Sequence, residues 1–370
     1  MSKNFILDGT VYSSEAPRVP LIIAELGTSH GADPVKAREL VDAAALAGAG
    51  CVKFQMVYAD EILHPNTGEV VLPGGPVKLY DTFKRLEVPL SFYSNMKEYT
   101  ESKGLFFLCT PFGPRSAREL WELQPKAVKV ASPELNYTAL LKQIAGYNLP
   151  VFLSTGVSKL GDIETALGCF PPERVCLLHC VTAYPAPERE YNLRTLESLG
   201  AVFGTAVGLS DHSTDPELAP ALAAAMGAVA VEKHFCMSRN DPGLDDPIAL
   251  PPDSFARMVR AVTRAAAMSR EEVIAAYSRE RGEDLVRAVL GDGVKRLAPS
   301  EQANYERTNR SLHALRDIAE GEIIEAGMTG ILRTEKVLRP GLPPSWAERI
   351  IGRKARRFIP AGEGIRFEDC

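Results

Sequence analysis

The chain has 370 residues, of which 45% are hydrophobic and 24% are charged, and its formal net charge is −5. These values are ordinary for a globular protein and exclude general disorder, while the slight acidic excess argues against nucleic acid as the main partner. The length exceeds one compact domain, because a (β/α)₈ barrel uses about 250 residues, and no apolar run reaches the roughly 18 residues of a membrane span.

The N-terminus reads MSKNFILDGTVYSSEAP and lacks the basic-then-apolar pattern of a signal peptide. We therefore expect a cytoplasmic enzyme with no membrane partner. Seven cysteines are scattered, mostly within apolar runs, and no C-x-x-C pair is present. This pattern predicts buried, reduced thiols.

A unit recurs between residues 19 and 235, in which a short apolar run ends in polar residues and a helical stretch follows. The near-continuous hydrophobicity of these runs is typical of parallel strands buried on both faces. Two of the helices open with Asp33–Pro34 and Asp215–Pro216 as cap and first turn. The apolar runs span residues 19–27, 51–55, 105–112, 127–132, 150–156, 175–181, 207–212 and 228–235.

Eight strands that alternate with helices predict an α/β fold, a closed (β/α)₈ TIM barrel. The alternative is a doubly wound open sheet, which would fit six or seven strands better. That fold would also be expected to carry a G-x-G-x-x-G turn after its first strand, and the sequence has none there.

The composition changes after the predicted barrel. A charged, helix-rich stretch covers about 252–295, and a polar stretch follows it. From about residue 309, short β-like segments are broken by Gly and Pro, and residues 314–324 look like residues 355–365. We predict a barrel domain over 1–290 with a short N-terminal β segment and a helical extension, a linker over 291–308, and a small, internally repeated β module over 309–370.

Polar side chains gather where the predicted strands end, which is the face of a barrel that carries chemistry. Burying an ammonium on a strand is costly unless an anion meets it, so the lysines suggest a bound phosphate or carboxylate. The alternative is that each lysine pairs with a neighbouring glutamate. The strand-end residues are Glu25, Lys53, Gln55, Thr110, Lys129, Ser132, Ser154, His179, Ser210, Asp211, His212, Glu232, Lys233 and His234.

His212 and His234 stand at the ends of the last two predicted strands, one β/α unit apart. Adjacent strands bring their imidazoles together above the barrel, and such a pair with a carboxylate or water suits Mn²⁺, Zn²⁺, Co²⁺ or Fe²⁺. With two protein nitrogens the site would be open and catalytic rather than structural. His179, deep in the run LLHC, is equally compatible with a buried core histidine.

The strand ends carry an ordered set of motifs, which are IIAELGTSH, VKFQ, CTPFG, KVAS, LSTG, LLHC, YPAP, GLSDHS and VEKHF. This ordered set resembles the sialic acid synthases. The resemblance continues through NRSL, RPG and IIGRKARRFIPAGEGI, which are similar to the antifreeze-like (SAF, β-clip) domain that ends this family's chains. It implies condensation of phosphoenolpyruvate with N-acetylmannosamine or a related 2-acetamido sugar, giving a nine-carbon 2-keto-3-deoxy sugar acid and phosphate.

The resemblance also implies roles for individual residues. Glu25 is implied as a general acid/base, and His212 and His234 as the ligands of a divalent metal, with Mn²⁺ expected first and Mg²⁺ or Co²⁺ as alternatives. Arg339, of the RPG motif, is implied to reach the sugar in a partner subunit, which predicts a domain-swapped homodimer. Phosphoenolpyruvate is implied to contact Lys53, Thr110, Lys129, Ser132, Ser154 and Ser210, and the sugar to contact Gln55, Tyr184 and Asp245 in addition to Arg339.

Departures from the family pattern cluster near the sugar. TSHGAD keeps His30 but loses two asparagines, CVTAYPAP is closer to enzymes for legionaminic or pseudaminic acid, and Asp246 replaces a common histidine. The segment Gly341–Trp346 is shorter than usual. The acceptor therefore stays open between 2-acetamido and 2,4-diacetamido hexoses, and the roles of His30 and His179 stay open too.

Two other functions remain compatible with the sequence. One is a barrel metallohydrolase that uses the two histidines to activate water, which would be expected to show a His-x-His on its first strand. Glu25-Leu26-Gly27 offers none. The other is a catalytically silent, sugar-binding homologue that keeps the fold.

Overall fold

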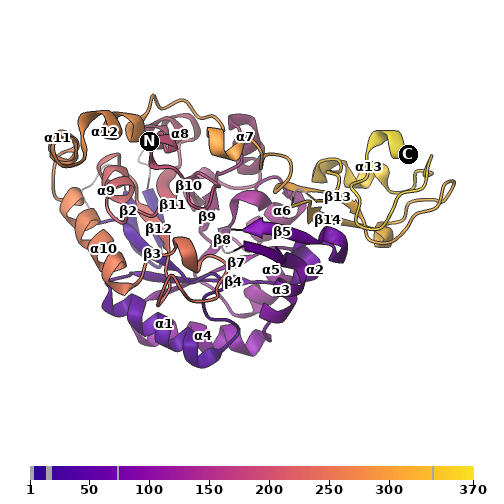
Figure 1. Ribbon diagram of the computed structural model, residues 1–370, viewed down its shortest axis with the longest axis horizontal. Helices are drawn as coiled ribbons and strands as arrows, with labels where there is room; N and C mark the ends of the chain where they lie inside the picture. The colour runs from indigo at the N-terminus through magenta and orange to yellow at the C-terminus, as the bar shows by residue number, and fades with distance from the viewer. Residues whose placement is uncertain (1–3, 14–18, 73–74, 336) are drawn as a thin grey trace.

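The structure is a computed structural model that describes residues 4–13, 19–72, 75–335 and 337–370 (Figure 1). The first three residues of the predicted 1–290 domain therefore lie outside the described residues. Strands β1 (Asn4–Leu7) and β2 (Thr10–Ser13) form an antiparallel hairpin. Its buried Phe5 packs against Phe152 inside the barrel with ring centroids 4.8 Å apart, so the hairpin closes the end opposite the strands' carboxyl termini.

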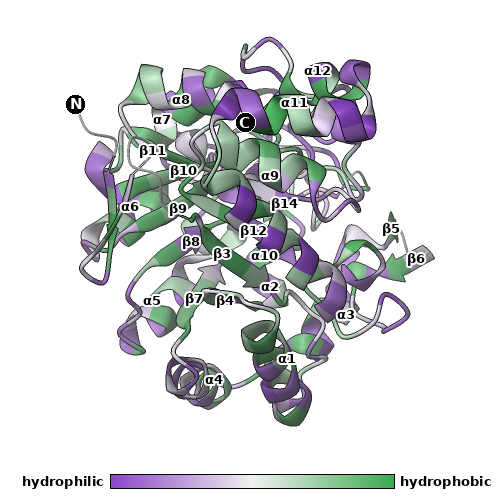
Figure 2. Ribbon diagram, turned by 90° about the vertical axis from the view of Figure 1, so that its left-hand side faces the viewer, coloured by the Kyte–Doolittle hydropathy of each residue, from purple (hydrophilic) through white to green (hydrophobic). Residues whose placement is uncertain are grey.

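Eight parallel strands form the centre of the molecule in the order β7-β4-β3-β12-β11-β10-β9-β8, and β7 and β8 lie beside each other at the seam. This near-closed ring confirms the predicted TIM-like barrel and excludes the open sheet. Figure 2 shows mostly hydrophobic barrel strands surrounded by helices that carry both hydrophilic and hydrophobic residues. The strands are β3 (Leu21–Glu25), β4 (Cys51–Met56), β7 (Phe106–Pro111), β8 (Val128–Val130), β9 (Val151–Ser154), β10 (Val175–Cys180), β11 (Ala206–Asp211) and β12 (Ala230–His234).

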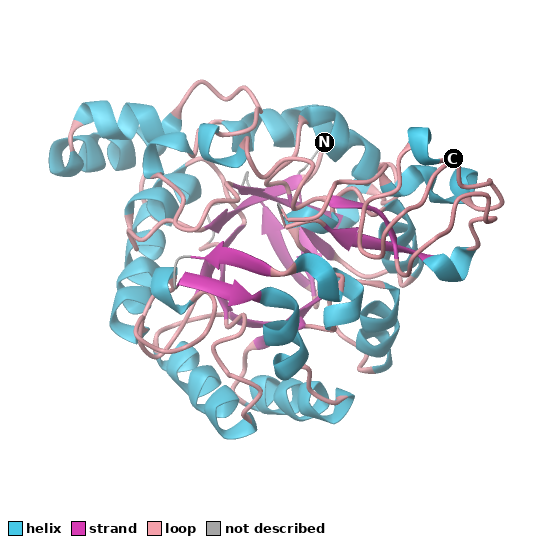
Figure 3. Cartoon of the chain, turned by 45° about the vertical axis from the view of Figure 1, so that its right-hand side comes forward, coloured by secondary structure: helices cyan, strands magenta, loops and turns pink. Residues whose placement is uncertain are grey.

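Helices surround the strands (Figure 3). Asp33 caps the first long helix, because its side chain accepts a hydrogen bond from the Val35 amide. The helix predicted from Asp215 begins at Leu218, and the Asp215 carboxylate accepts the amides of Glu217 at 2.7 Å and Leu218 at 2.9 Å, as a capping residue does. The helices are α1 (Pro34–Leu46), α2 (Ala59–Ile62), α3 (Leu79–Leu86), α4 (Leu90–Ser102), α5 (Pro114–Glu122), α6 (Thr138–Gly146), α7 (Leu160–Leu167), α8 (Thr195–Phe203), α9 (Leu218–Ala225), α10 (Pro252–Ala266), α11 (Arg270–Arg281), α12 (Glu283–Leu290) and α13 (Ala347–Ile350).

The state of the cysteines and the absence of a membrane-spanning segment were both predicted from the sequence. All seven cysteines are free, and six of them are buried, as expected for reduced thiols. Over the described ranges, no helix combines the length and the apolar character that a membrane crossing requires.

The long connection between β4 and β7 contains a hairpin that the sequence analysis did not predict. Its strands are β5 (Glu69–Leu72) and β6 (Gly75–Lys78), and they pair antiparallel. Val70 belongs to an apolar cluster with Val57, Leu79 and Phe112 at the open end of the barrel. The hairpin therefore forms part of the wall around the barrel mouth.

The C-terminal module projects from one side of the barrel (Figure 1). Strands β13 (Arg310–Ala314) and β14 (Thr329–Arg333) pair antiparallel. Ile318 and Ile359 occupy equivalent positions in the two similar segments and exchange two backbone hydrogen bonds of 2.9 Å. The internal similarity of the sequence thus corresponds to two segments that pair with each other around one small core.

Candidate active site

A cavity of about 590 Å³ opens at the carboxyl ends of the barrel strands. The residues with predicted catalytic, metal or substrate roles come together here from all parts of the barrel, and of that set Arg339 alone does not line the cavity. The strand-end candidates His179, Asp211 and Lys233 do not line it either. Residues from the C-terminal module also reach its wall. The predicted residues that line it are Glu25, Lys53, Gln55, Thr110, Lys129, Ser132, Ser154, Tyr184, Ser210, His212, His234 and Asp245.

Lys53 lies at the floor of the cavity between two carboxylates. Its Nζ is 3.1 Å from Glu25 Oε2 and 2.9 Å from Glu232 Oε1. Burial by itself lowers the pKa of Lys53, but the Glu232 and Glu25 charges outweigh burial and hold the pKa above its usual value. The pairing of a lysine with neighbouring glutamates, which the sequence left open, is therefore present at Lys53.

Lys129 is less fully paired, because its Nζ lies 3.7 Å from Glu232 Oε1. Burial and the nearby Lys53 charge lower the pKa of Lys129 to about 8, although Glu232 opposes them. Glu232 also accepts the Ser210 hydroxyl at 2.9 Å, and despite burial the two lysines lower its pKa to about 2. Glu232 therefore bonds to or pairs with Lys53, Lys129 and Ser210, which are all predicted phosphoenolpyruvate contacts. Its position at the end of a strand did not reveal this role.

Hydroxyl groups line the wall next to the lysines. The Thr110 and Ser154 hydroxyls are buried and have no hydrogen-bond partner within the described residues. Ser132 Oγ accepts the Gly156 amide at 3.0 Å. A Cβ on Gly156 would lie 2.0 Å from Thr182 Oγ1, so only glycine allows this close approach. Hydroxyls beside two ammonium groups are suited to an anionic ligand.

Glu25 is held in a defined orientation. Gln55 Nε2 donates to Glu25 Oε1 at 2.6 Å, while Lys53 occupies the other carboxylate oxygen. Lys53 and Gln55 are two positions apart on β4 and therefore lie on the same face, because side chains alternate along a strand. The Glu25 carboxylate is therefore fixed at the cavity floor, within reach of a bound ligand.

The His212 and His234 rings lie with centroids 5.6 Å apart. His212 Nδ1 is 2.9 Å from the Val181 carbonyl, which leaves Nε2 as the nitrogen that faces the cavity beside the Tyr184 hydroxyl at 3.3 Å. His234 Nδ1 lies 3.8 Å from Asp245 Oδ2. Burial lowers the pKa of His234 to about 3 even though Glu25 opposes it, so the ring is neutral.

This donor set fits a divalent metal in an open site. A neutral imidazole is the form that ligates metals, and Val181 fixes the tautomer of His212. Although burial opposes it, the neighbouring Cys180 raises the pKa of His212 to about 9, so a metal bound there would displace a proton. In the part of the chain that the structure describes, no three or more His, Cys, Asp or Glu side chains are grouped to hold a metal by themselves. Two imidazoles would therefore need oxygen ligands from water or substrate.

The C-terminal module contributes to its own barrel an arginine that was not predicted, while Arg339 is bonded within the module. Arg339 donates to the Gly364 carbonyl and the Asp369 carboxylate, both at 2.7 Å and both within the module. Arg333 lines the cavity instead, and its Nη2 lies 2.7 Å from Glu134 Oε1. Arg333 was not predicted, because within the module only the arginine of the RPG motif matched a residue that contacts the sugar in the family. The predicted contact of Arg339 with a partner subunit stays a prediction.

His30 and His179 make contacts that belong to the fold. His30 Nδ1 accepts the Ala32 amide at 3.1 Å, and its ring packs on Phe92. His179 Nε2 is 2.5 Å from the Tyr191 carbonyl. Neither lines the mouth cavity.

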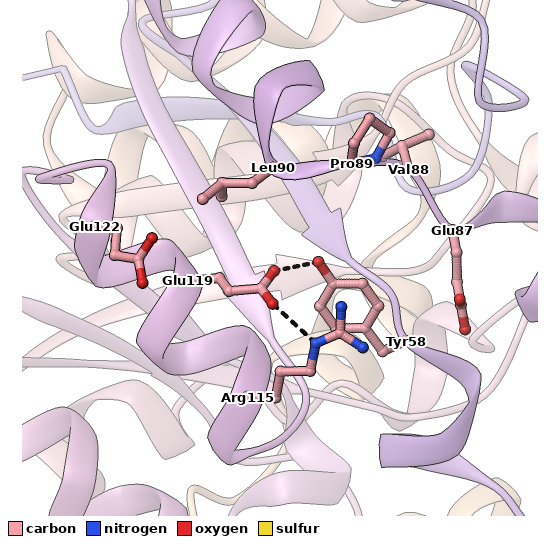
Figure 4. Close-up of a pocket in the computed structure, with 8 residues that line it drawn as sticks. All are labelled: Tyr58, Glu87, Val88, Pro89, Leu90, Arg115, Glu119 and Glu122. Carbon is pink, nitrogen blue, oxygen red and sulfur yellow. Dashed lines mark hydrogen bonds and ion pairs between the residues drawn. The ribbon is translucent and has the colours of Figure 1, made fainter.

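A second hollow lies outside the barrel mouth, next to α4 and α5 (Figure 4). There the Glu119 carboxylate accepts from both the Tyr58 hydroxyl and Arg115 Nε, and the Arg115 guanidinium stacks on the Tyr58 ring at 3.9 Å. Because these charged groups satisfy one another, the barrel mouth is the stronger candidate for chemistry.

Comparison with known proteins follows the same division of the chain. Residues 40–273 match the NeuB family, and residues 309–369 match the SAF domain. The chain is 31% identical to the N,N'-diacetyllegionaminic acid synthase of Campylobacter jejuni, over 94% of this chain and 98% of the relative.

Two solved structures show the same architecture. The spore coat polysaccharide biosynthesis protein SpsE of Bacillus subtilis superposes with a TM-score of 0.81 at 32% identity, covering 99% of this chain and 98% of that one. The N-acetylneuraminic acid (sialic acid) synthetase of Leptospira borgpetersenii gives a TM-score of 0.66 at 29% identity, covering 83% and 96%.

Proposed function

The chain belongs to the NeuB family, and from this premise we propose that it is a synthase of nine-carbon sugar acids. It condenses phosphoenolpyruvate with N-acetylmannosamine or a related 2-acetamido or 2,4-diacetamido hexose. The products are a 2-keto-3-deoxy sugar acid of the sialic, legionaminic or pseudaminic type and inorganic phosphate. The observation that carries the proposal is the cavity in which two lysines, several hydroxyls, one fixed carboxylate and two histidines converge.

Phosphoenolpyruvate is proposed to bind at the floor of the cavity. Its phosphate and carboxylate match the ammonium groups of Lys53 and Lys129, which stand on neighbouring sides of Glu232. The unpartnered hydroxyls of Thr110 and Ser154 are ready to donate to anionic oxygens. Ser132 and Ser210 complete the proposed donor half of the site.

The acceptor sugar is proposed to bind above, next to Tyr184 and Asp245, with Arg333 of the module in the same wall. His212 and His234 would hold a divalent metal, with Mn²⁺ as our first choice and Mg²⁺ or Co²⁺ as alternatives. When bound, that metal would supply a Lewis acid for the carbonyl oxygen of the open-chain sugar. The Tyr184 ring stacks on the His212 ring with centroids 4.2 Å apart and so shields that face of the imidazole from solvent.

Glu25 is proposed as the acid/base. C3 of phosphoenolpyruvate forms the bond to the sugar's carbonyl carbon, the C=O π pair moves to the carbonyl oxygen as an alkoxide, and water adds to the resulting cationic centre at C2. The Glu25 carboxylate, held by Gln55 and Lys53, takes the proton that this water loses and returns it to the alkoxide, which becomes a hydroxyl of the product. Cleavage of the C2–O bond of the tetrahedral adduct then releases phosphate, which carries away the proton of the C2 hydroxyl, and leaves the 2-keto group.

A hydrolase finds less support in the site. Hydrolytic metal sites typically present three protein ligands, and the described residues form no such group here. The direct test mixes purified protein, Mn²⁺, phosphoenolpyruvate and a panel of 2-acetamido and 2,4-diacetamido aldoses, and follows phosphate release. Release that requires one of the sugars supports the synthase. A folded, metal-loaded protein that releases no phosphate with any sugar is the silent homologue instead.

We further propose the homodimer in which Arg339 reaches the partner's sugar site. The support is the resemblance of the RPG segment to the family. The test mixes two inactive variants, His212→Ala and Arg339→Ala. In a shared site, one barrel of the mixed dimer regains both native residues and activity returns. Mixtures that stay inactive despite subunit exchange would contradict the arrangement.

A further inference from the structure

Arg310, the first residue of β13, is the point at which the C-terminal module enters the barrel. Its side chain is fully buried, with 0% exposure. The guanidinium Nε donates to Glu134 Oε1 at 2.9 Å, and Nη2 donates to the Phe112 carbonyl at 2.6 Å. Nη1 donates to the carbonyls of Glu61 at 2.5 Å and Ile62 at 3.4 Å. A planar guanidinium with five N–H groups can satisfy such a set of acceptors, and an ammonium cannot.

The acceptors belong to three different loops of the barrel mouth. Glu61 and Ile62 lie in α2, which follows β4. Phe112 directly follows β7, and Glu134 ends the short turn Ser132–Glu134 that follows β8. One side chain of the module therefore joins the loops after three consecutive strands of the barrel.

These three strands carry the donor half of the proposed site. Lys53 is on β4, Thr110 on β7 and Lys129 on β8. Ser132 begins the turn that Glu134 ends, two residues away. If the three loops shifted relative to one another, the distances between the side chains predicted to contact phosphoenolpyruvate would change.

The cost of burying the Arg310 charge holds its side chain firmly to the acceptors in the three loops. Removing a charge from water costs several kcal/mol, so a buried cation persists only when its acceptors surround it completely. Glu134 is also fully buried, and its Oε1 accepts a second module arginine, Arg333, at 2.7 Å. Loss of Arg310 would leave three loop carbonyls and part of a buried carboxylate unsatisfied, and the loops would rearrange.

We propose that Arg310 is a positioning residue for phosphoenolpyruvate, which couples the seating of the C-terminal module to the donor half of the active site. The inference rests on the proposed function. It extends the role of the module beyond the acceptor sugar, because the module then organises the contacts of both substrates.

The test compares Arg310→Gln, Arg310→Lys and Glu134→Gln with the wild-type protein. Calorimetric titration with phosphoenolpyruvate, without sugar, measures donor binding directly, and steady-state phosphate release gives both KM values and kcat. We expect Arg310→Gln to raise the Kd and KM for phosphoenolpyruvate at least tenfold while the KM for sugar changes less than threefold. Arg310→Lys should restore part of the loss, and Glu134→Gln should resemble Arg310→Gln.

Arg357→Gln is the matched control, because Arg357 also donates to a buried carboxylate, Asp369, but inside the module. We expect its phosphoenolpyruvate binding to equal that of the wild type. Fluorescence of Trp346, which lies in the module, reports in a Trp121→Phe background whether each variant keeps the module folded. If Arg310→Gln does not fold, Arg310→Lys and Glu134→Gln decide by the same criteria.

Two results would overturn the inference. One is a folded variant whose phosphoenolpyruvate binding stays within twofold of the wild type. The other is an equal loss in both KM values and kcat, which indicates general destabilisation. A wild-type protein that binds phosphoenolpyruvate but turns over no sugar would defeat the proposed function alone, because the titration still measures the effect of Arg310.

Discussion

Glu301 offers a sharp test of how the predicted linker supports the active site. Its side chain is buried, and Oε1 accepts the amides of Val157 and Thr182 at 2.7 and 2.8 Å. Oε2 accepts the Ala298 amide at 3.0 Å. Val157 and Thr182 lie in the loops after β9 and β10, which bring Ser154 and Tyr184 to the cavity. One linker carboxylate therefore holds two loops of the mouth.

The expected cost follows from these three bonds. Hydrogen bonds to a charged group contribute about 1.5–3 kcal/mol each, and an orphaned buried donor costs about 1–3 kcal/mol. In Glu301→Gln one oxygen can keep the first two amides, but the side-chain NH₂ then faces the Ala298 amide, so we expect a loss of about 1.5–3 kcal/mol. Glu301→Ala orphans all three amides and should lose at least about 3 kcal/mol.

Urea unfolding measures this loss in the barrel alone. The chain has two tryptophans, Trp121 in α5 and Trp346 in the module, so a Trp346→Phe background leaves a barrel reporter. Glu272→Gln is the control, because Glu272 also accepts a backbone amide, that of Ser269, but on the surface, and should cost about 1 kcal/mol or less. A free energy of unfolding for Glu301→Ala within 1 kcal/mol of the background protein would refute the reasoning.

Three further predictions concern the cavity. Because the pKa of Lys129 is about 8, its charge is lost as pH rises through that value. We therefore expect kcat/KM for phosphoenolpyruvate to fall up to tenfold per pH unit above about 8. Lys129→Arg should abolish this fall, and an identical fall in the variant would contradict the assignment. His212→Ala should reduce Mn²⁺-dependent phosphate release by about 10³-fold in a Mn²⁺ titration, whereas wild-type turnover that survives chelation would argue against the metal. Gly156→Ala should destabilise the protein by about 1–3 kcal/mol in thermal unfolding. Thr182→Ala in the same chain should recover only part of this loss, because the new Cβ still lies 2.9 Å from Ser132 Oγ. If Thr182→Ala recovers nothing, the contact with Thr182 is not the cause of the loss.

The barrel was predictable because its signal is local and repeated. Eight apolar runs with polar ends are sufficient to place Glu25, Lys53 and Lys129 at one mouth, since the carboxyl ends of parallel strands meet there. The β5–β6 hairpin was not predicted, because Glu69–Lys78 is a short segment within one long connection and has no period of its own. Its place in the cavity wall depends on apolar contacts with distant residues such as Phe112.

The contribution of the tail was harder to predict for a different reason. Arg310 and Arg333 are ordinary charged residues in the sequence, and only the fold shows that both reach Glu134, more than 170 positions earlier in the chain. The same holds for Glu301, which sits in a polar stretch that the composition identifies as a linker. Long-range pairing leaves no periodic pattern, so sequence reasoning finds the strands that carry a site more easily than the residues that hold its loops.

The position of these anchors limits how subunits can share a site. Asn309 donates to the Val157 carbonyl at 3.2 Å, and the next residue is the buried Arg310, so no slack separates the linker from the module. A swap that carried the whole module to another barrel would have to break both contacts and leave the Arg310 charge unpaired during the exchange. The swapped contact is therefore compatible with this chain only if Arg310 stays on its own barrel while Arg339, which binds Asp369 within the module, meets the partner. Under that arrangement the donor half of each active site is organised within one chain, and only the acceptor half depends on the second.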